Sequence, residues 1–239
     1  MNFFISPNKR KRQHPISIIV IHYTEIDWLQ TKNCFLDPKK EVSSHLVIDI
    51  DGTVNRFVDD DEVAYHAGKS YWRGITGVND YSIGIELVHP GFTNAGGIRV
   101  DGNPLSWVPY AQAQINTLIE VCKNYIEKYK IMPYNIVGHS DIAPGRKQDP
   151  GPLFPWHMLS KKGIGMKLPT SHHPTNKTID STYGKKLLQQ IGYFVDDEPS
   201  SEFFALQAFQ MHFRQKNISG KWDPETIMLL KALAVEIGV

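Results

Sequence analysis

The segment 16–21 (ISIIVI) constrains the fold more than any other part of the chain, because five of its six residues are Ile or Val. An apolar run of strand length rich in β-branched side chains predicts a strand buried on both faces. This strand ends at His22, whose side chain can bind a metal ion or transfer a proton. The chain therefore needs a sheet with other elements packed on both of its faces.

A β-hairpin is predicted at 45–58, where apolar residues alternate from Leu46 to Ile50. Asp51-Gly52 provides the positive φ that a tight connection requires. Three further elements follow, namely strands at 82–88 and 135–137 and a helix at 112–129 whose apolar residues recur at i, i+3, i+4 and i+7. Strands interleaved with a long amphipathic helix predict an α/β fold with a mixed central β-sheet flanked by helices.

The composition changes near residue 161. The segment 161–178 is rich in Gly, Pro, His, Lys and Thr with little apolar periodicity, which is typical of a linker. Beyond it only helical patterns remain, and Asp223 is an expected N-cap with Pro224 at the first helical position. We therefore expect a domain at 1–160, a linker at 161–178 and a small three-helix domain at 179–239.

Composition excludes several classes of protein. The 26 Lys and Arg residues balance 25 Asp and Glu residues, which removes the electrostatic argument for nonspecific binding to nucleic acid. No uninterrupted apolar segment approaches the roughly 20 residues of a membrane span, so no transmembrane segment is expected. The two cysteines, Cys34 and Cys122, are expected to be unpaired thiols, because ten histidines beside only two cysteines favour metal or acid-base chemistry over a disulfide scaffold.

Two histidines and an aspartate are candidate ligands of a single zinc ion. His22 and His139 each end a predicted strand, and Asp149 lies in the loop that follows. Carboxyl ends of adjacent strands meet at one edge of a sheet, and two imidazoles with one carboxylate leave a fourth zinc position open, as in catalytic sites. Asp141 is the alternative to Asp149, and it could instead orient the imidazole of a ligand histidine without binding the metal itself. The open position implies hydrolysis.

Five strings of residues occur in a fixed order over roughly residues 14–160. They are IIVIHYT at 18–24, SSHLVI at 43–48, AYHAG at 64–68, NDYSIGIEL at 79–87 and GHSDIAPGRKQDPG at 138–151. In these strings the sequence resembles the type 2 N-acetylmuramoyl-L-alanine amidases, a family that shares its fold with phage amidases and peptidoglycan recognition proteins. The resemblance implies that fold for the first domain.

The resemblance also implies roles for individual residues. His22, His139 and Asp149 match the zinc ligands of the family, and Glu86 and Lys147 match its catalytic pair. A carboxylate beside a metal can take a proton from attacking water, and an ammonium two residues from a ligand can reach a developing oxyanion. The alternatives are a solvent-facing strand carboxylate at Glu86 and a solvated loop charge at Lys147.

Two further residues are candidates for binding substrate. His66 matches a position near the substrate groove of the family, and Asn79 could hydrogen-bond the sugar or the peptide. The alternatives are that His66 helps to hold its loop and that Asn79 makes a turn.

The C-terminal segment resembles a three-helix peptidoglycan-binding module at 218–226, but the Gly- and Asp-rich turn usual in its first half reads DDEP at 196–199. Glycan binding or simple packing are therefore both open for this module.

The function implied is that of a zinc hydrolase. It cleaves the amide between N-acetylmuramic acid, or 1,6-anhydro-N-acetylmuramic acid, and L-alanine of peptidoglycan or muropeptides during cell-wall turnover or recycling. The alternatives are a non-catalytic peptidoglycan recognition protein, which characteristically lacks part of the zinc triad, and a carbohydrate deacetylase, which usually has two histidines at i, i+4. The expected partner is peptidoglycan or a muropeptide, and no oligomer is required. The extra module favours the bacterial cell envelope or periplasm, and recycling alone would favour the cytoplasm.

Overall fold

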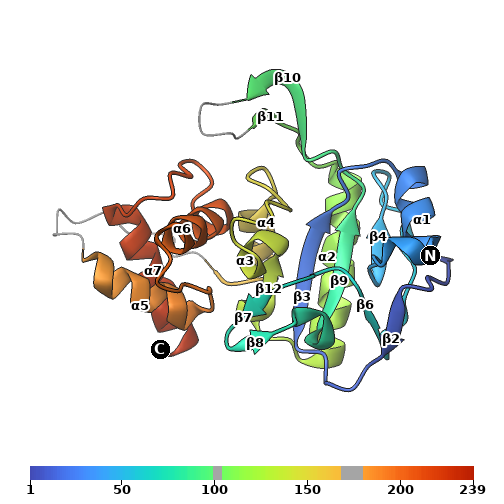
Figure 1. Cartoon of the computed structure of the whole chain (residues 1–239), viewed down its shortest axis with the longest axis horizontal. Coiled ribbons are helices and arrows are strands. Elements are labelled where there is room, and N and C mark those ends of the chain that lie inside the picture. Colours follow the sequence, from blue (N-terminus) through green and yellow to red (C-terminus); the bar gives the residue numbers. More distant parts are fainter. Residues whose placement is uncertain (99–103, 168–179) are drawn as a thin grey trace.

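A six-stranded sheet forms the centre of the computed structural model, with strands in the order β1-β5-β4-β9-β3-β12 (Figure 1). The structure describes residues 1–98, 104–167 and 180–239. The strands of this sheet are β1 (Asn2–Phe3), β3 (Ile18–Tyr23), β4 (Leu46–Ile48), β5 (Val54–Arg56), β9 (Ser82–Leu87) and β12 (Ile136–Gly138). Strand β3 is parallel to β9 and β12, whereas β4 and β5 are antiparallel. This arrangement confirms the predicted mixed sheet.

Every residue of β3 is buried, as the apolar run predicted. Successive side chains of a strand point to opposite faces, so Ile19 and Ile21 face one layer and Ile18 and Val20 face the other. His22 follows Val20 on the second of these faces. The alternation along β3 therefore decides which side of the sheet carries the candidate ligand.

Helix α2 (Gln112–Tyr129) covers the first face and has the bounds that its periodicity predicted. The buried residues of this helix that pack in one apolar cluster with Ile19 and Ile21 are Ile115, Leu118, Ile119, Cys122 and Tyr125. Cys122 is buried and Cys34 is half-buried, and both are free thiols. The prediction of unpaired cysteines is confirmed.

Several short elements surround the sheet. They are the strands β2 (Lys9–Lys11), β6 (Glu62–Ala64), β7 (Tyr71–Trp72), β8 (Ile75–Thr76), β10 (Phe92–Ile98) and β11 (Pro104–Trp107), the helices α1 (Trp28–Leu36), α3 (His139–Ile142) and α4 (Trp156–Lys161), and the 3-10 turns η1 (Pro38–Lys40), η2 (Val78–Tyr81) and η3 (Pro133–Asn135). Helix α1 was not predicted from its apolar pattern, because it buries only Thr31 and Phe35. Its N-cap is Asp27, whose side chain accepts from the backbone N–H of Gln30 at 2.8 Å.

The C-terminal residues form helices α5 (Ser181–Ile191), α6 (Pro199–Phe213) and α7 (Pro224–Ile237). The predicted cap of the last helix is confirmed, because Asp223 Oδ1 accepts from the backbone N–H of Thr226 at 2.9 Å. Most of the predicted linker lies outside the described residues. None of the helices in the described parts of the chain is both long and apolar enough to cross a membrane.

The three C-terminal helices, which we call the C-terminal module (180–239), pack through α6 against α3 and α4 and share a buried apolar cluster with the second face of the sheet. Ile18 and Val20 of β3 belong to the same buried apolar cluster as Leu188 of α5 and Leu233 of α7. Figure 1 shows these helices in orange and red beside α3 and β12. The module thus shares a buried apolar cluster with the sheet.

Candidate metal centre

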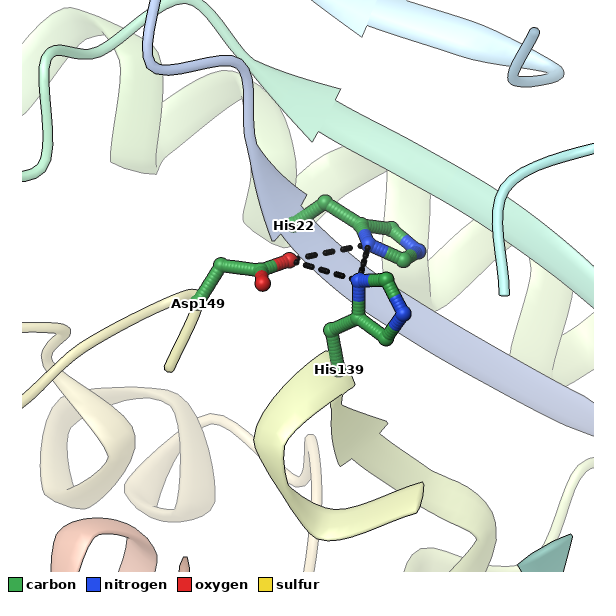
Figure 2. A group of neighbouring side chains, drawn as sticks. All are labelled: His22, His139 and Asp149. Atoms are coloured by element: carbon green, nitrogen blue, oxygen red, sulfur yellow. Dashed lines mark hydrogen bonds and ion pairs between the residues drawn. The ribbon is translucent and has the colours of Figure 1, made fainter. Parts of the chain in front are cut away.

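Three buried side chains from distant parts of the sequence converge at one edge of the sheet (Figure 2). His22 lies near the end of β3, His139 begins α3 directly after β12, and Asp149 lies in the loop after α3. The Nδ1 atoms of His22 and His139 are 2.9 Å apart, and Asp149 Oδ2 lies 3.0 Å from the first and 3.1 Å from the second. Because β12 runs parallel to β3, both strands deliver their histidines to the same edge.

A close backbone approach brings Asp149 to this edge. A Cβ atom on Gly138 would lie 2.5 Å from Cδ of Pro150, so only glycine allows the contact. The backbone N–H of Ser140 also donates to the carbonyl of Asp149 at 2.9 Å. The loop is therefore held against the residues that flank His139.

A chain of hydrogen bonds determines which nitrogen of His22 faces the site. Ser82 Oγ donates to the carbonyl of Val78 at 2.7 Å, so it accepts from His66 Nε2 at 3.1 Å. His66 Nδ1 is then the acceptor for His22 Nε2–H at 2.9 Å. The lone pair of His22 is consequently on Nδ1, which points into the site.

His139 is oriented in the same sense. Its Nε2 lies 3.2 Å from the carbonyl oxygen of Ala67 and donates to it, which leaves the lone pair on Nδ1. Arg146 donates to the same carbonyl at 2.7 Å and to the carbonyl of Lys69 at 2.8 Å. The loop that follows β6 thus supports the ligand from behind.

The electrostatics of the three facing atoms fit a cation. Burial, with the neighbouring His139, lowers the pKa of His22 to about 4, so its ring is neutral near pH 7. Burial alone would raise the pKa of Asp149, but the facing His139 and His22 outweigh it and hold the pKa below its usual range. Two lone pairs and a carboxylate within 3.1 Å repel one another unless a positive ion lies between them. Their separations are close to the roughly 3.3 Å expected between ligands of a tetrahedral zinc ion with bonds of about 2.0–2.1 Å.

Asp141, the alternative ligand, points away from this group. Its Oδ2 accepts from the backbone N–H of Gly138 at 2.7 Å and from His212 Nδ1 at 2.7 Å, and its Oδ1 accepts from the hydroxyl of Tyr193 at 2.6 Å. Both carboxylate oxygens are therefore engaged elsewhere. The donor set is completed by Asp149.

Glu86 lies beside His22 on the same face of the sheet, because the two are register partners in the parallel strands β9 and β3. Its Oε2 is buried and has no hydrogen-bond partner in the described parts of the chain. Burial and the charge of Asp149 raise the pKa of Glu86 well above its usual value, and the charge of Lys147 opposes this shift. The side chain of Lys147 is exposed in the loop between α3 and Asp149. The structure thus places Glu86 beside His22 and Lys147 in the loop that carries Asp149, and the catalytic roles of both stay a prediction.

His66 and Asn79 lie behind the ligands. Both ring nitrogens of the buried His66 are engaged, by His22 and by Ser82. The side-chain oxygen of Asn79 accepts from the backbone N–H groups of His66 at 3.0 Å and Ala67 at 2.8 Å. These contacts fit the alternative in which both residues hold the loop, and contact with substrate stays a prediction.

Sequence reasoning missed the residues that support the ligands. Ser82 could have been found, because it alternates with Glu86 on the face of β9 that carries the site. Tyr193 and His212 reach Asp141 from the C-terminal module, and no local pattern signals such contacts.

Two imidazoles and one carboxylate at the edge of a mixed sheet, with a further carboxylate beside them, define the class of metal-dependent hydrolases with an open metal position. The family model described as N-acetylmuramoyl-L-alanine amidase matches residues 12–152. The chain belongs to this family and is an enzyme of the amidase class, as the resemblance implied. The deacetylase alternative is therefore wrong.

Similar proteins match over nearly the whole chain. The N-acetylmuramoyl-L-alanine amidase AmiD of Escherichia coli is 38% identical over 93% of this chain and 84% of the relative. A solved structure of AmiD in complex with anhydro-N-acetylmuramic acid-L-Ala-D-gamma-Glu-L-Lys has a TM-score of 0.84 and 36% identity, covering 95% of this chain and 91% of the other. AmpDh3 of Pseudomonas aeruginosa in complex with anhydromuramic pentapeptide has a TM-score of 0.79 and 30% identity, covering 93% and 92%. The match confirms the α/β fold.

Proposed function

We propose that the chain is a zinc-dependent amidase that cleaves the bond between the lactyl carbonyl of muramic acid and the amino group of L-alanine. The observation that carries this proposal is the convergence of three lone-pair donors beside Glu86, whose buried oxygen has no partner within the described residues. A recognition protein that only binds muropeptides would need neither a complete donor set nor a buried carboxylate with a raised pKa. His22, His139 and Asp149 would hold the ion.

The residues around the site divide the chemistry among them. When bound, zinc would polarise the amide carbonyl and lower the pKa of water to about 7. Glu86 accepts the proton of the attacking water as the new C–O bond forms. It then delivers this proton to the alanine nitrogen as the C–N bond breaks. The raised pKa of Glu86 suits both steps, because it makes the carboxylate a better base and its conjugate acid able to hold the proton.

Lys147 contributes through its charge. The proposal is supported by the effect of its charge, which lowers the pKa of both Glu86 and His22. A positive group near the reacting carbonyl stabilises the oxygen that becomes negative when the carbonyl turns tetrahedral. Lys147 therefore has the role of an oxyanion stabiliser.

We propose that anhydro-muropeptides are among the substrates. Support comes from the two related structures, AmiD and AmpDh3, which are complexes with anhydromuramic peptides and match this chain over more than nine-tenths of its length. The envelope is the proposed compartment, because a module appended to the amidase is most useful where polymeric peptidoglycan occurs. Cell fractionation with antibodies against the native protein tests that location.

One experiment tests the reaction. Protein of measured metal content is incubated separately with intact peptidoglycan and with anhydro-muropeptides, and the products are identified by mass spectrometry. Peptides with a free L-alanine amino terminus are expected from at least one substrate. Absence of cleavage of both substrates by zinc-loaded protein would refute the proposal.

Removal of the metal provides the matched control. Dialysis against a chelator should abolish cleavage while leaving the circular dichroism spectrum in place, because the sheet and its two layers do not depend on the ion for their core. Addition of one equivalent of zinc should restore cleavage. Full activity in protein shown to contain no metal would contradict the zinc assignment.

Peptidoglycan binding by the C-terminal module is a separate proposal. A groove of about 430 Å³ on this module is lined by Phe203, Leu206, Trp222, four carboxylates and two lysines. Aromatic surfaces beside carboxylates suit the sugar rings and amino groups of a muropeptide. The full-length Phe203→Ala variant should be retained less by insoluble peptidoglycan but should cleave soluble muropeptides like the wild type. Equal retention would favour a packing role for the module.

A further inference from the structure

The carboxylate of Asp141 links the C-terminal module to the helix that carries a metal ligand. Asp141 is fully buried and lies two residues after His139 in α3. Its three hydrogen-bond donors are the backbone N–H of Gly138, the hydroxyl of Tyr193 and Nδ1 of His212, at 2.7, 2.6 and 2.7 Å. The last two donors belong to the module.

Both side-chain donors are held firmly by aromatic packing. The ring of His212 lies between Trp156 and Phe213, with ring centroids 3.7 and 4.0 Å away and nearly parallel planes. The ring of Tyr193 packs edge-on against Trp72 at a centroid distance of 5.2 Å and is buried. The positions of the two donors are therefore determined by the module and by its contacts with α4 and β7.

The backbone N–H bonded to Asp141 has a particular place in the metal centre. Gly138 directly precedes His139, and it is also the residue against which Pro150 packs. A shift of Gly138 would change the separation between His139 and the loop that carries Asp149. Asp141 holds this residue in place, and a buried carboxylate keeps such a position only when its donors are present.

We propose that the C-terminal module positions the metal ligand His139 through Asp141, with Tyr193 and His212 as the positioning residues. This inference rests on the metal site of the proposed function. It gives the module a part in metal binding and turnover that is independent of any contact with peptidoglycan. Neither residue touches the metal or the substrate.

The test separates the hydrogen bonds from the packing. Tyr193→Phe removes only a hydroxyl, and His212→Phe keeps an aromatic ring between Trp156 and Phe213 but removes the donor. His212→Asn does the reverse, because its side-chain amide can take the place of Nδ1. Zinc affinity is measured by competition with a chromophoric chelator, and the geometry of the site is followed by the visible spectrum of cobalt-substituted protein.

Loss of a group that orients a metal ligand typically weakens metal binding about 10- to 100-fold. We therefore expect Tyr193→Phe and His212→Phe each to weaken zinc binding by about 10-fold or more and to change the cobalt spectrum. In zinc-saturated protein kcat should fall with little change in KM. His212→Asn should restore most of the zinc affinity, although it lacks the ring.

Arg73→Met is the matched control. Arg73 donates to the carbonyl oxygens of Gln190 and Ile191 across the same interface but has no bond to Asp141. This variant should bind zinc like the wild type. Equal weakening by Arg73→Met, or equal weakening by His212→Asn and His212→Phe, would show a general loosening of the interface and overturn the inference.

Wild-type zinc affinity in folded Tyr193→Phe and His212→Phe would also overturn it, while leaving the amidase proposal intact. If His212→Phe does not fold, Tyr193→Phe decides alone, because it leaves the aromatic packing in place. Failure of the wild type to bind zinc or cleave any muropeptide would instead refute the proposed function, so the two failures are distinguishable.

Discussion

Glu86 and His22 are register partners in the parallel strands β9 and β3, so their side chains lie next to each other. The pKa values of the two side chains are shifted in opposite directions. Burial keeps the ring of His22 neutral by lowering its pKa, and it raises the pKa of Glu86. The same desolvation therefore acts in opposite directions on an imidazole and on a carboxylate. The contribution of each side chain can be measured by removing one functional group at a time.

Glu86→Gln should lower kcat by at least about 100-fold, because a positioned general base typically contributes about 10²- to 10⁴-fold. The amide is nearly isosteric with the carboxylate but cannot carry the proton from water to the leaving nitrogen. The zinc content should stay at that of the wild type, since Glu86 is not one of the three donors. Metal analysis and turnover of an anhydro-muropeptide check both statements, and undiminished kcat would exclude Glu86 as the base.

Lys147→Ala should also lower turnover by at least about 100-fold, since loss of one oxyanion-stabilising group costs roughly 2.7–4 kcal/mol in other hydrolases. The variant should keep its zinc, because Lys147 donates no ligand atom. Lys123→Ala on the exposed side of α2 is the matched control for loss of one lysine and should be fully active. Unchanged turnover in Lys147→Ala would leave this lysine as a solvated loop charge.

Ser82→Ala should weaken zinc binding by about 10-fold or more, although Ser82 does not touch the ion. Without the hydroxyl, His66 loses the acceptor for its Nε2–H and no longer presents Nδ1 reliably to His22. Chelator competition measures the affinity. An affinity equal to that of the wild type would mean that the packing of His66 alone orients His22.

At the scale of elements, polar contacts join the loop after β5 to helix α2, and the apolar periodicity of the sequence does not predict these contacts. Asp60 follows β5 and accepts from Arg56 at 2.8 Å, and it also accepts from three side chains of α2, namely Tyr125 at 2.9 Å, Lys128 at 2.8 Å and Tyr129 at 2.8 Å. The apolar face of α2 was predictable from its period, whereas this polar attachment was not. A single carboxylate thus fastens the C-terminal half of α2 to the loop after β5.

Asp60→Asn should lower the free energy of unfolding by about 1–3 kcal/mol at pH 7, because it leaves Arg56 with a weaker buried partner. Burial alone would raise the pKa of Asp60, but hydrogen bonds from Arg56 and Lys128 outweigh it and hold the pKa below its usual range. A carboxylate with a lowered folded pKa stabilises the fold above its unfolded pKa of about 3.9 and loses this effect as the pH falls through the folded pKa. Urea unfolding at pH 7 and pH 3 should therefore show a smaller difference between variant and wild type at the lower pH. A constant difference would assign the effect to packing.

At the scale of the whole molecule, the catalytic region and the C-terminal module form one structure. Val20 of β3 and Leu230 of α7 lie in one buried apolar cluster, and Gln215 donates to the carbonyl of Phe154 at 2.6 Å across the same interface. The division near residue 161 describes the sequence well, but burial continues across it. Unfolding of the module should therefore expose buried apolar residues of the sheet such as Val20.

Leu233→Ala tests this continuity. Leu233 is fully buried in the shared cluster, and truncation of such a leucine costs about 2–5 kcal/mol. Calorimetry should show a single transition at a lower midpoint for the variant, with loss of amidase activity over the same temperature range. Two separate transitions, with activity surviving the first, would show that the module unfolds independently.

The sequence alone was sufficient for the long periodic elements and for His22, His139 and two candidate aspartates as metal donors. Strand β3, helix α2 and the cap of α7 follow from apolar period and capping chemistry, which depend on neighbours within a few residues. The convergence of His22 and His139 was also predictable, because parallel strands bring the residues at their carboxyl ends to a common edge. Only the tertiary structure decided between Asp149 and Asp141, and it did so because Asp141 is bonded to Tyr193 and His212 of the module. Hydrogen bonds between residues 50 or more positions apart produce no local pattern in the sequence. The orientation of the donors, and the contribution of the module to that orientation, can therefore be seen only in the folded structure.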